Sequence, residues 1–196
     1  MNTEINFIKT FIKENKNYII AALLYTVFCI FLFIIIPISE SEKQMFMQSA
    51  KEYVEKMITD NNFQLFLNIF LNNFSIALIV FLSGFVLSFL SIFIVLSNIF
   101  VIWIVLSFGI AKVWLLTSLL AILPHGIIEI SAILLSLALS FKLTHLVVKK
   151  AWNRKKYKIW WEIKKSFQFF WTFVLLLLLI AAFIEAFITP LFLGKF

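Results

Sequence analysis

Residues 63–123 form an almost uninterrupted apolar stretch, which limits what the chain can fold into more than any other feature. The stretch is much too long for one transmembrane helix, which needs about 20 apolar residues, and it suits two helices joined by a tight turn. The whole chain of 196 residues is 63% hydrophobic and only 14% charged. Soluble domains are roughly half apolar and a quarter charged, so a water-soluble fold is excluded. We expect one membrane domain over residues 1–196 and no second globular domain.

Prolines and polar breaks divide this domain into about five transmembrane helices. Pro37 closes the first helix, and Ser97-Asn98 is the expected turn between the second and the third. Pro124 opens the fourth and Pro190 ends the fifth, because proline suits a first helical turn and breaks a helix interior. The expected spans are residues 18–37, 74–96, 99–120, 124–148 and 167–189. The predicted fold class is all-α, a polytopic transmembrane helix bundle with additional interfacial amphipathic helices.

The first span follows a lysine-containing segment and superficially resembles a secretory signal. It has the length of a full span and no small-residue cleavage site follows it, so we expect it to be retained. Before it, Ile5, Ile8, Phe11 and Ile12 recur at helical spacing opposite lysines. This pattern is typical of a short helix that lies in the membrane interface.

An acidic segment follows the first span. Over residues 41–59 apolar side chains repeat at helical spacing, and Ser41 with Gln44 has the spacing of a capping box. We predict an amphipathic helix on the outer surface. We interpret it as a helix that seals the bundle, and docking of a partner is the alternative, because amphipathicity alone does not identify a partner.

A strongly basic segment precedes the last span. Nine cations and a single acid, Glu162, lie between residues 142 and 165, with Trp152, Trp160 and Trp161 among them. Basic residues with tryptophan beside a span are typical of a cytoplasmic interfacial helix, which we predict over residues 149–166. The net charge of +7 is then explained by membrane orientation, so we expect no nucleic-acid partner.

The same charge asymmetry orients the whole chain. The positive-inside rule places the N-terminus and the basic segment in the cytoplasm, and five crossings leave residues 39–62 and the C-terminus outside. We therefore expect a multi-pass protein of the cell membrane. Cys29 is the single cysteine, which excludes a disulfide or a thiolate metal site within one chain.

Several polar side chains fall where the bilayer is expected, although an unpaired charge there costs several kcal/mol. His125 and Glu129 share a helix face, since they are four residues apart. We predict that both converge with Glu185, close to Asn73, in the outer half of the bundle. Lys112 either pairs with a glutamate or extends to the headgroups, and His145 lies at the cytoplasmic interface. The candidate binding or structural cluster is Asn72, Asn73, Lys112, His125, Glu129 and Glu185.

Small residues predict the faces on which the helices meet, because they let two backbones approach closely inside a membrane. Such residues recur along one face of the second, fourth and fifth spans. The predicted packing residues are Gly84, Ser88, Gly126, Ala132, Ser136, Ala182 and Ala186.

Three separate motifs resemble the stage II sporulation protein M family of membrane proteins, and they occur in the family's order. Residues 123–129, Leu-Pro-His-Gly-Ile-Ile-Glu, resemble its PHGxxE hallmark. Asn72-Asn73 followed by Ala77 and Gly84 is similar to its NN…A…G segment, and residues 181–190 are similar to its AAxxEaxxTP close. In spore-forming bacteria the resemblance implies a subunit that assembles with a peptidoglycan-degrading partner and another membrane protein during engulfment. The wider family includes organisms that never sporulate, so this role does not transfer automatically.

Three classes of function are compatible with these features. The resemblance favours a non-catalytic membrane scaffold or assembly subunit, whose partners are the lipid bilayer, other membrane proteins and, in one variant, further copies of the chain. A conduit for a small solute, ion or lipid is the first alternative, because a charged cluster would open outward. An intramembrane hydrolase using His125, Glu129 and Glu185 is the second. A site of one histidine and two carboxylates would be sparse for zinc, so we expect no enzyme, metal or cofactor.

Overall fold

A computed structural model describes residues 2–36, 38–57, 59, 61–112, 115–152 and 159–190, and all the regular elements within these ranges are helices. Their bounds are α1 Asn2–Glu14, α2 Lys16–Ile35, α3 Glu40–Met57, α4 Asn62–Leu82, η1 Ser83–Val86, α5 Phe89–Lys112, α6 Leu115–Trp152, α7 Trp160–Phe169, η2 Phe170–Val174, α8 Leu175–Phe183 and η3 Ile184–Ile188. The all-α bundle that the sequence predicts is confirmed.

Four of the described helical segments are long and apolar enough to cross a membrane. They are Lys16–Ile35, Asn62–Val86, Gly126–Trp152 and Trp160–Ile188. The last of these joins α7, η2, α8 and η3 into one rod with two wide π-helical turns. The apolar segment Phe89–Ile104 of α5 is shorter. The count of five spans therefore remains a prediction.

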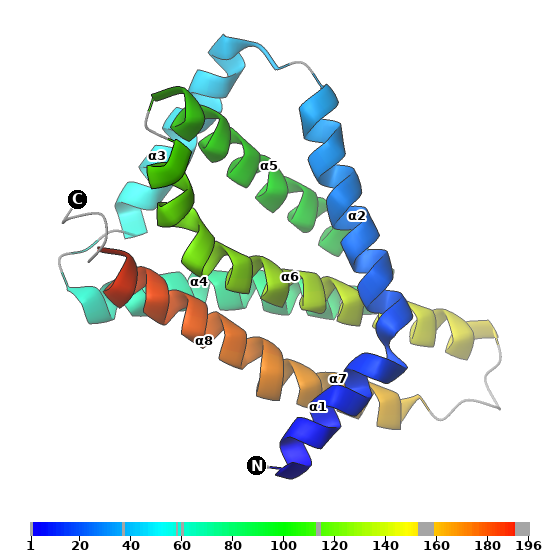
Figure 1. Ribbon diagram of the computed structural model, residues 1–196. Helices are drawn as coiled ribbons and strands as arrows, with labels where there is room; N and C mark the ends of the chain where they lie inside the picture. The colour runs from blue at the N-terminus through cyan, green and yellow to red at the C-terminus, as the bar shows by residue number, and fades with distance from the viewer. Residues whose placement is uncertain are drawn as a thin grey trace.

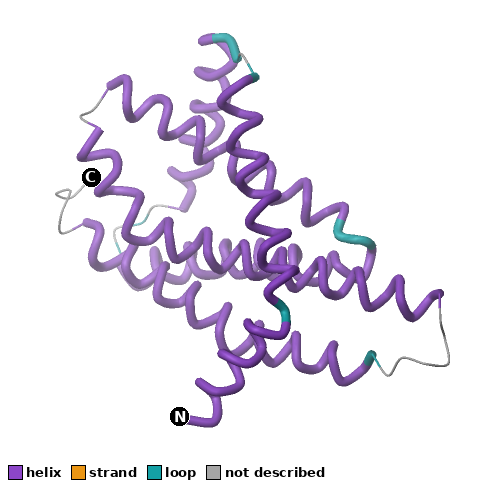
Figure 2. The backbone as a smooth tube through the Cα atoms, turned by 45° about the vertical axis from the view of Figure 1, so that its right-hand side comes forward, coloured by secondary structure: helices purple, strands orange, loops and turns teal. Residues whose placement is uncertain are grey.

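Three long helices lie side by side and form the main layer of the bundle. Figure 1 shows α4, α6 and α8 in this layer, and each contacts the other two. Figure 2 shows the same arrangement from a second direction, with α2 crossing α6 in both views. α2 also contacts α5, and α3 contacts α5 and α4. The end of the layer where α6 finishes and α7 begins carries the basic segment and is here called the basic end.

Buried apolar side chains fill the spaces on both faces of α6. One cluster joins α4, α6 and α8 and includes the stacked rings of Phe81 and Phe170, whose centroids lie 5.0 Å apart. A second cluster joins α2, α5 and α6 around Cys29, Val95 and Leu137. α6 is thus the central helix of the described bundle.

The predicted turn at Ser97-Asn98 is wrong. The chain turns at Leu87 and Ser88, which both have left-handed backbone angles (φ of 66° and 57°), and α5 runs straight through Ser97 and Asn98. Both side chains donate to carbonyl oxygens of their own helix, Ser97 to Phe93 O and Asn98 to Ile94 O, each at 3.0 Å. Polar side chains that bond one turn back do not need a turn in the chain. The helices on either side therefore begin and end about ten residues earlier than expected.

Two further boundaries differ from the prediction. α6 begins at Leu115, so Pro124 lies inside a helix and does not start one. Membrane helices tolerate such prolines when neighbouring groups satisfy the freed carbonyl. The basic segment is not a separate helix over residues 149–166, because α6 continues to Trp152 and α7 begins at Trp160, while residues 153–158 lie outside the described part.

The amphipathic segment after the first span forms α3, Glu40–Met57, close to the predicted residues 41–59. Its capping box uses Ser39 and Glu42 in place of Ser41 and Gln44. Ser39 N and Ser39 Oγ donate to Glu42 Oε2 at 3.0 and 2.6 Å, and Glu42 N donates to Ser39 Oγ at 3.3 Å. These hydrogen bonds from Ser39 hold the pKa of the Glu42 carboxyl below its usual value.

Candidate functional site

The end of the bundle opposite the basic end holds a chain of polar side chains that links three helices. Asn72 Nδ2 donates to Asn73 Oδ1 at 3.1 Å, both on α4. The Asn73 side chain hydrogen-bonds to the carboxyl group of Glu129 on α6. An ionised carboxylate only accepts hydrogen bonds, so the amide NH₂ group of Asn73 is the donor toward Glu129. Glu185, on η3, lies close enough to Glu129 for the two carboxyl groups to interact electrostatically.

These contacts bring together four of the six side chains in the predicted cluster. Asn73 is buried, with 6% of its surface exposed, while Glu129 and Glu185 are half-buried. The side chains of the other two members, Lys112 and His125, lie outside the described residues. Two neighbouring carboxyl groups in a bilayer require hydrogen bonds or a counter-charge, and the Asn72-Asn73 pair supplies one such hydrogen bond.

No group of three potential metal-ligating side chains occurs among the residues whose side chains are described. His125 is not among these residues. The described part of the cluster joins α4 to α6 by a hydrogen bond and places Glu185 of η3 near Glu129.

The seven predicted packing residues are all buried. Gly84 makes the closest approach, because a Cβ atom placed on it would lie 2.8 Å from Leu143 Cβ and from Ser140 Cα of α6, and would also collide with Ser140 O. The other six are Ser88, Gly126, Ala132, Ser136, Ala182 and Ala186.

Sequence reasoning named Ser88 as a packing residue but missed the cluster of hydroxyl groups that surrounds this approach. Ser140 Oγ on α6 lies 2.8 Å from Ser88 Oγ and 2.6 Å from Ser91 Oγ, and Ser83 Oγ bonds to Ser91 Oγ. Thr144 Oγ1 lies 2.6 Å from Ser88 Oγ and donates to Gly84 O at 3.0 Å. The sequence contained a signal for this cluster, because Ser83 and Ser88 lie on either side of Gly84 inside the apolar stretch of residues 63–123.

The basic end contains a buried ion pair that the sequence analysis also missed. Lys142 is 3% exposed, and its Nζ lies 2.9 Å from Glu162 Oε2 and 4.4 Å from the centre of the Phe11 ring. Lys165 Nζ bridges Glu162 Oε1 at 3.3 Å and Glu14 Oε2 at 3.8 Å. These contacts join α6 and α7 to the N-terminal helix α1.

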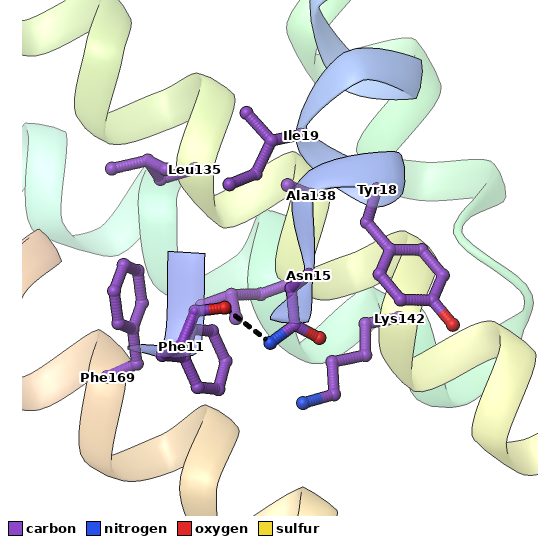
Figure 3. Close-up of a pocket in the computed structure, with 9 residues that line it drawn as sticks. Phe11, Asn15, Tyr18, Ile19, Leu135, Ala138, Lys142 and Phe169 are labelled. Carbon is purple, nitrogen blue, oxygen red and sulfur yellow. Dashed lines mark hydrogen bonds between the residues drawn. The ribbon is translucent and has the colours of Figure 1, made fainter. Parts of the chain in front are cut away.

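A small cavity lies beside this ion pair. Figure 3 shows the Lys142 side chain extending past Asn15, whose Nδ2 donates to Phe11 O at 2.8 Å. The cavity has a volume of about 10 Å³, which is close to the space that one water molecule needs. We therefore regard it as a packing feature of the basic end rather than a ligand site.

The comparison with protein families decides the family. The family model described as stage II sporulation protein M matches residues 18–190, which include every residue of the polar cluster. The chain belongs to this family. The resemblance inferred from the three motifs is thereby confirmed, and so is the assignment to membrane proteins of this type.

A curated relative matches part of the chain. An uncharacterized protein of Methanocaldococcus jannaschii is 42% identical over 69 residues, which cover 35% of this chain and 39% of that protein. The match thus spans about two-fifths of the relative's length. No solved structure matches the chain.

Proposed function

We propose that this member of the stage II sporulation protein M family is a non-catalytic scaffold or assembly subunit of a membrane complex. The observation that carries the proposal is that the polar groups inside the bundle bond to one another across helices. Ser140 joins α6 to Ser88 in the turn before α5, Lys142 joins α6 to α7, and Asn73 joins α4 to α6. Such contacts stabilise a rigid platform.

The outer helix α3 offers a surface on which a protein partner could assemble. Phe46 packs against Phe100 of α5 with ring centroids 4.9 Å apart, and Lys43 lies over the Trp103 ring at 5.9 Å. One side of α3 is thereby attached to the bundle, while Gln48 and Glu52 are exposed. A helix held on one face and polar on the other suits a docking surface that does not move relative to the membrane domain.

Photo-crosslinking in membranes of the source organism tests this role. A photoreactive amino acid at Gln48 or Glu52 should give a defined adduct with another protein. The matched control is Ile34 of α2, which is 68% exposed on an apolar helix and should react only with lipid. A wall hydrolase encoded beside this gene would agree with a scaffold, and a neighbouring ATPase subunit would favour transport.

A negative crosslinking result would favour one of the two alternative functions, a conduit or an intramembrane hydrolase. If α3 gives no protein adduct and the chain purifies alone in mild detergent, the scaffold is refuted. If Glu185→Gln then abolishes the cellular phenotype while thermal stability stays unchanged, the carboxyl pair is a conduit or a catalytic site.

The orientation is part of the same proposal. The cations at the basic end support a cytoplasmic N-terminus, with α3 and the C-terminus outside. In a Cys29→Ser background, Ser49→Cys on α3 should react with an impermeant thiol reagent in intact cells, and Trp160→Cys should react only after permeabilisation. The reversed labelling pattern would refute this topology.

A further inference from the structure

A groove lies between α2 and α6 and opens at the basic end, and Thr144 of the hydroxyl cluster is part of its lining. Its volume is about 470 Å³. This size lies within the range of about 300–1,000 Å³ that is typical of small-molecule sites. Tyr18 and Ala21 of α2 form one wall, and one face of α6 forms the other.

The polar part of the groove suits an anion. Lys149 contributes a lysine side chain to the lining, and His145 lies one helical turn before it on the same face of α6. The ring of Tyr18 meets the ring of His145 edge-on, with centroids 5.8 Å apart and an interplanar angle of 90°. An ammonium group, an imidazole N–H and a phenol O–H can all donate hydrogen bonds to phosphate oxygens.

The apolar part of the groove suits an acyl chain. Phe141, Val148 and Trp152 line it from α6, and Ala21 contributes only a methyl group from α2. From Lys149 back to Phe141 the helix rises about 12 Å, which covers most of the roughly 15 Å of hydrocarbon in one leaflet. Trp152 is 89% exposed at the mouth, where aromatic side chains are common at membrane surfaces.

We propose that this groove binds one anionic phospholipid from the leaflet at the basic end. Its phosphate lies against Lys149, with His145 and Tyr18 as further donors, and one acyl chain follows Ala21 and Phe141 into the bilayer. A soluble phosphate would leave the apolar wall unused, and a zwitterionic lipid has no net charge to match the lysine. The inference does not depend on the scaffold role.

Native mass spectrometry of the purified full chain in detergent tests the proposal. The protein is titrated separately with dioleoylphosphatidylglycerol and with dioleoylphosphatidylcholine. The wild type should retain phosphatidylglycerol at lower concentration than phosphatidylcholine. Lys149→Gln should weaken phosphatidylglycerol binding about fivefold, which is the effect expected for one lysine near an anionic headgroup.

Two further variants separate a specific groove from general surface charge. Lys164→Gln removes the same charge from an exposed position on α7 outside the groove lining, and it should leave the affinity within about twofold. Ala21 is exposed in the groove, so Ala21→Phe should fill the apolar part of the groove and reduce retention of both lipids. Equal binding of the two lipids by the wild type would overturn the proposal, as would equal effects of Lys149→Gln and Lys164→Gln or full retention in Ala21→Phe.

Discussion

Gly84→Ala tests how closely η1 approaches α6. The added methyl carbon would meet Ser140 Cα and Leu143 Cβ at 2.8 Å, and it would also overlap Ser140 O. Two of these three atoms belong to the α6 backbone, so rotation of a side chain cannot relieve the overlap. The helix itself must move away.

The size of the effect follows from two opposing contributions. Overpacking a close helix contact costs about 1–3 kcal/mol, and backbone atoms that cannot yield place this site at the upper end. Alanine has a better helical propensity than glycine by up to about 1 kcal/mol, which offsets part of the cost. We expect a net loss of about 2 kcal/mol, which corresponds to a melting temperature about 4–8 °C lower for a chain of this length.

Thermal unfolding in detergent, followed by the loss of helical circular dichroism, measures this change. Ser131→Thr is the matched control, because it adds one methyl group to an exposed position of α6 and keeps the hydroxyl that donates to Ile127 O. The control should melt within about 1 °C of the wild type. A Gly84→Ala variant that melts at or above the wild-type temperature would show that η1 and α6 are not packed this closely.

Other substitutions test the ion pair and the polar cluster by the same assay. Glu162→Gln should lower the free energy of unfolding by about 2 kcal/mol, because it removes the counter-ion of the buried Lys142 ammonium. The loss is smaller than for a fully buried pair, because the Glu162 side chain is 37% exposed. Adding Lys142→Met should restore most of the loss, and a double variant no more stable than Glu162→Gln would contradict the pairing. Glu129→Gln should cost about 1 kcal/mol, because a neutral amide oxygen is a weaker acceptor for Asn73 than a carboxylate. Glu185→Gln should cost less, because it also removes the like-charge repulsion between the two carboxyl groups. If neither changes stability, the cluster is not structural.

The fold class and the contact between Asn73 and Glu129 could be predicted because both follow from what a bilayer demands of each segment, although the two residues lie far apart in the sequence. The apolar stretches determine that the chain is helical and in the membrane, and a carboxyl group in a bilayer must find a partner. Asn73 and Glu129 follow this reasoning, since each belongs to a small-residue face of its helix.

The turn between α4 and α5 could not be placed in the same way. Ser97-Asn98 is the most polar pair in residues 89–112, yet both side chains bond to their own helix, so polarity alone does not mark a turn. The actual break depends on Ser140 and Thr144, which lie more than 50 residues further along the chain. The Lys142–Glu162 pair is much closer in sequence, yet it was also missed, because the contact depends on how α6 packs against α7.

The break before α5 explains why the bundle suits a rigid role. Leu87 and Ser88 adopt left-handed angles that cost roughly 1–2 kcal/mol for each residue that is not glycine, and the break leaves backbone groups without helical partners inside an apolar region. Side chains replace those partners: Ser91 Oγ donates to Val80 O at 2.7 Å, and Thr144 Oγ1 donates to Gly84 O at 3.0 Å. Irregular backbone persists at membrane depth only where protein covers it. If α6 slid along the bundle, Gly84 O would lose its hydrogen bond from Thr144 and would be exposed to lipid. α6 and the break before α5 must therefore move as one body.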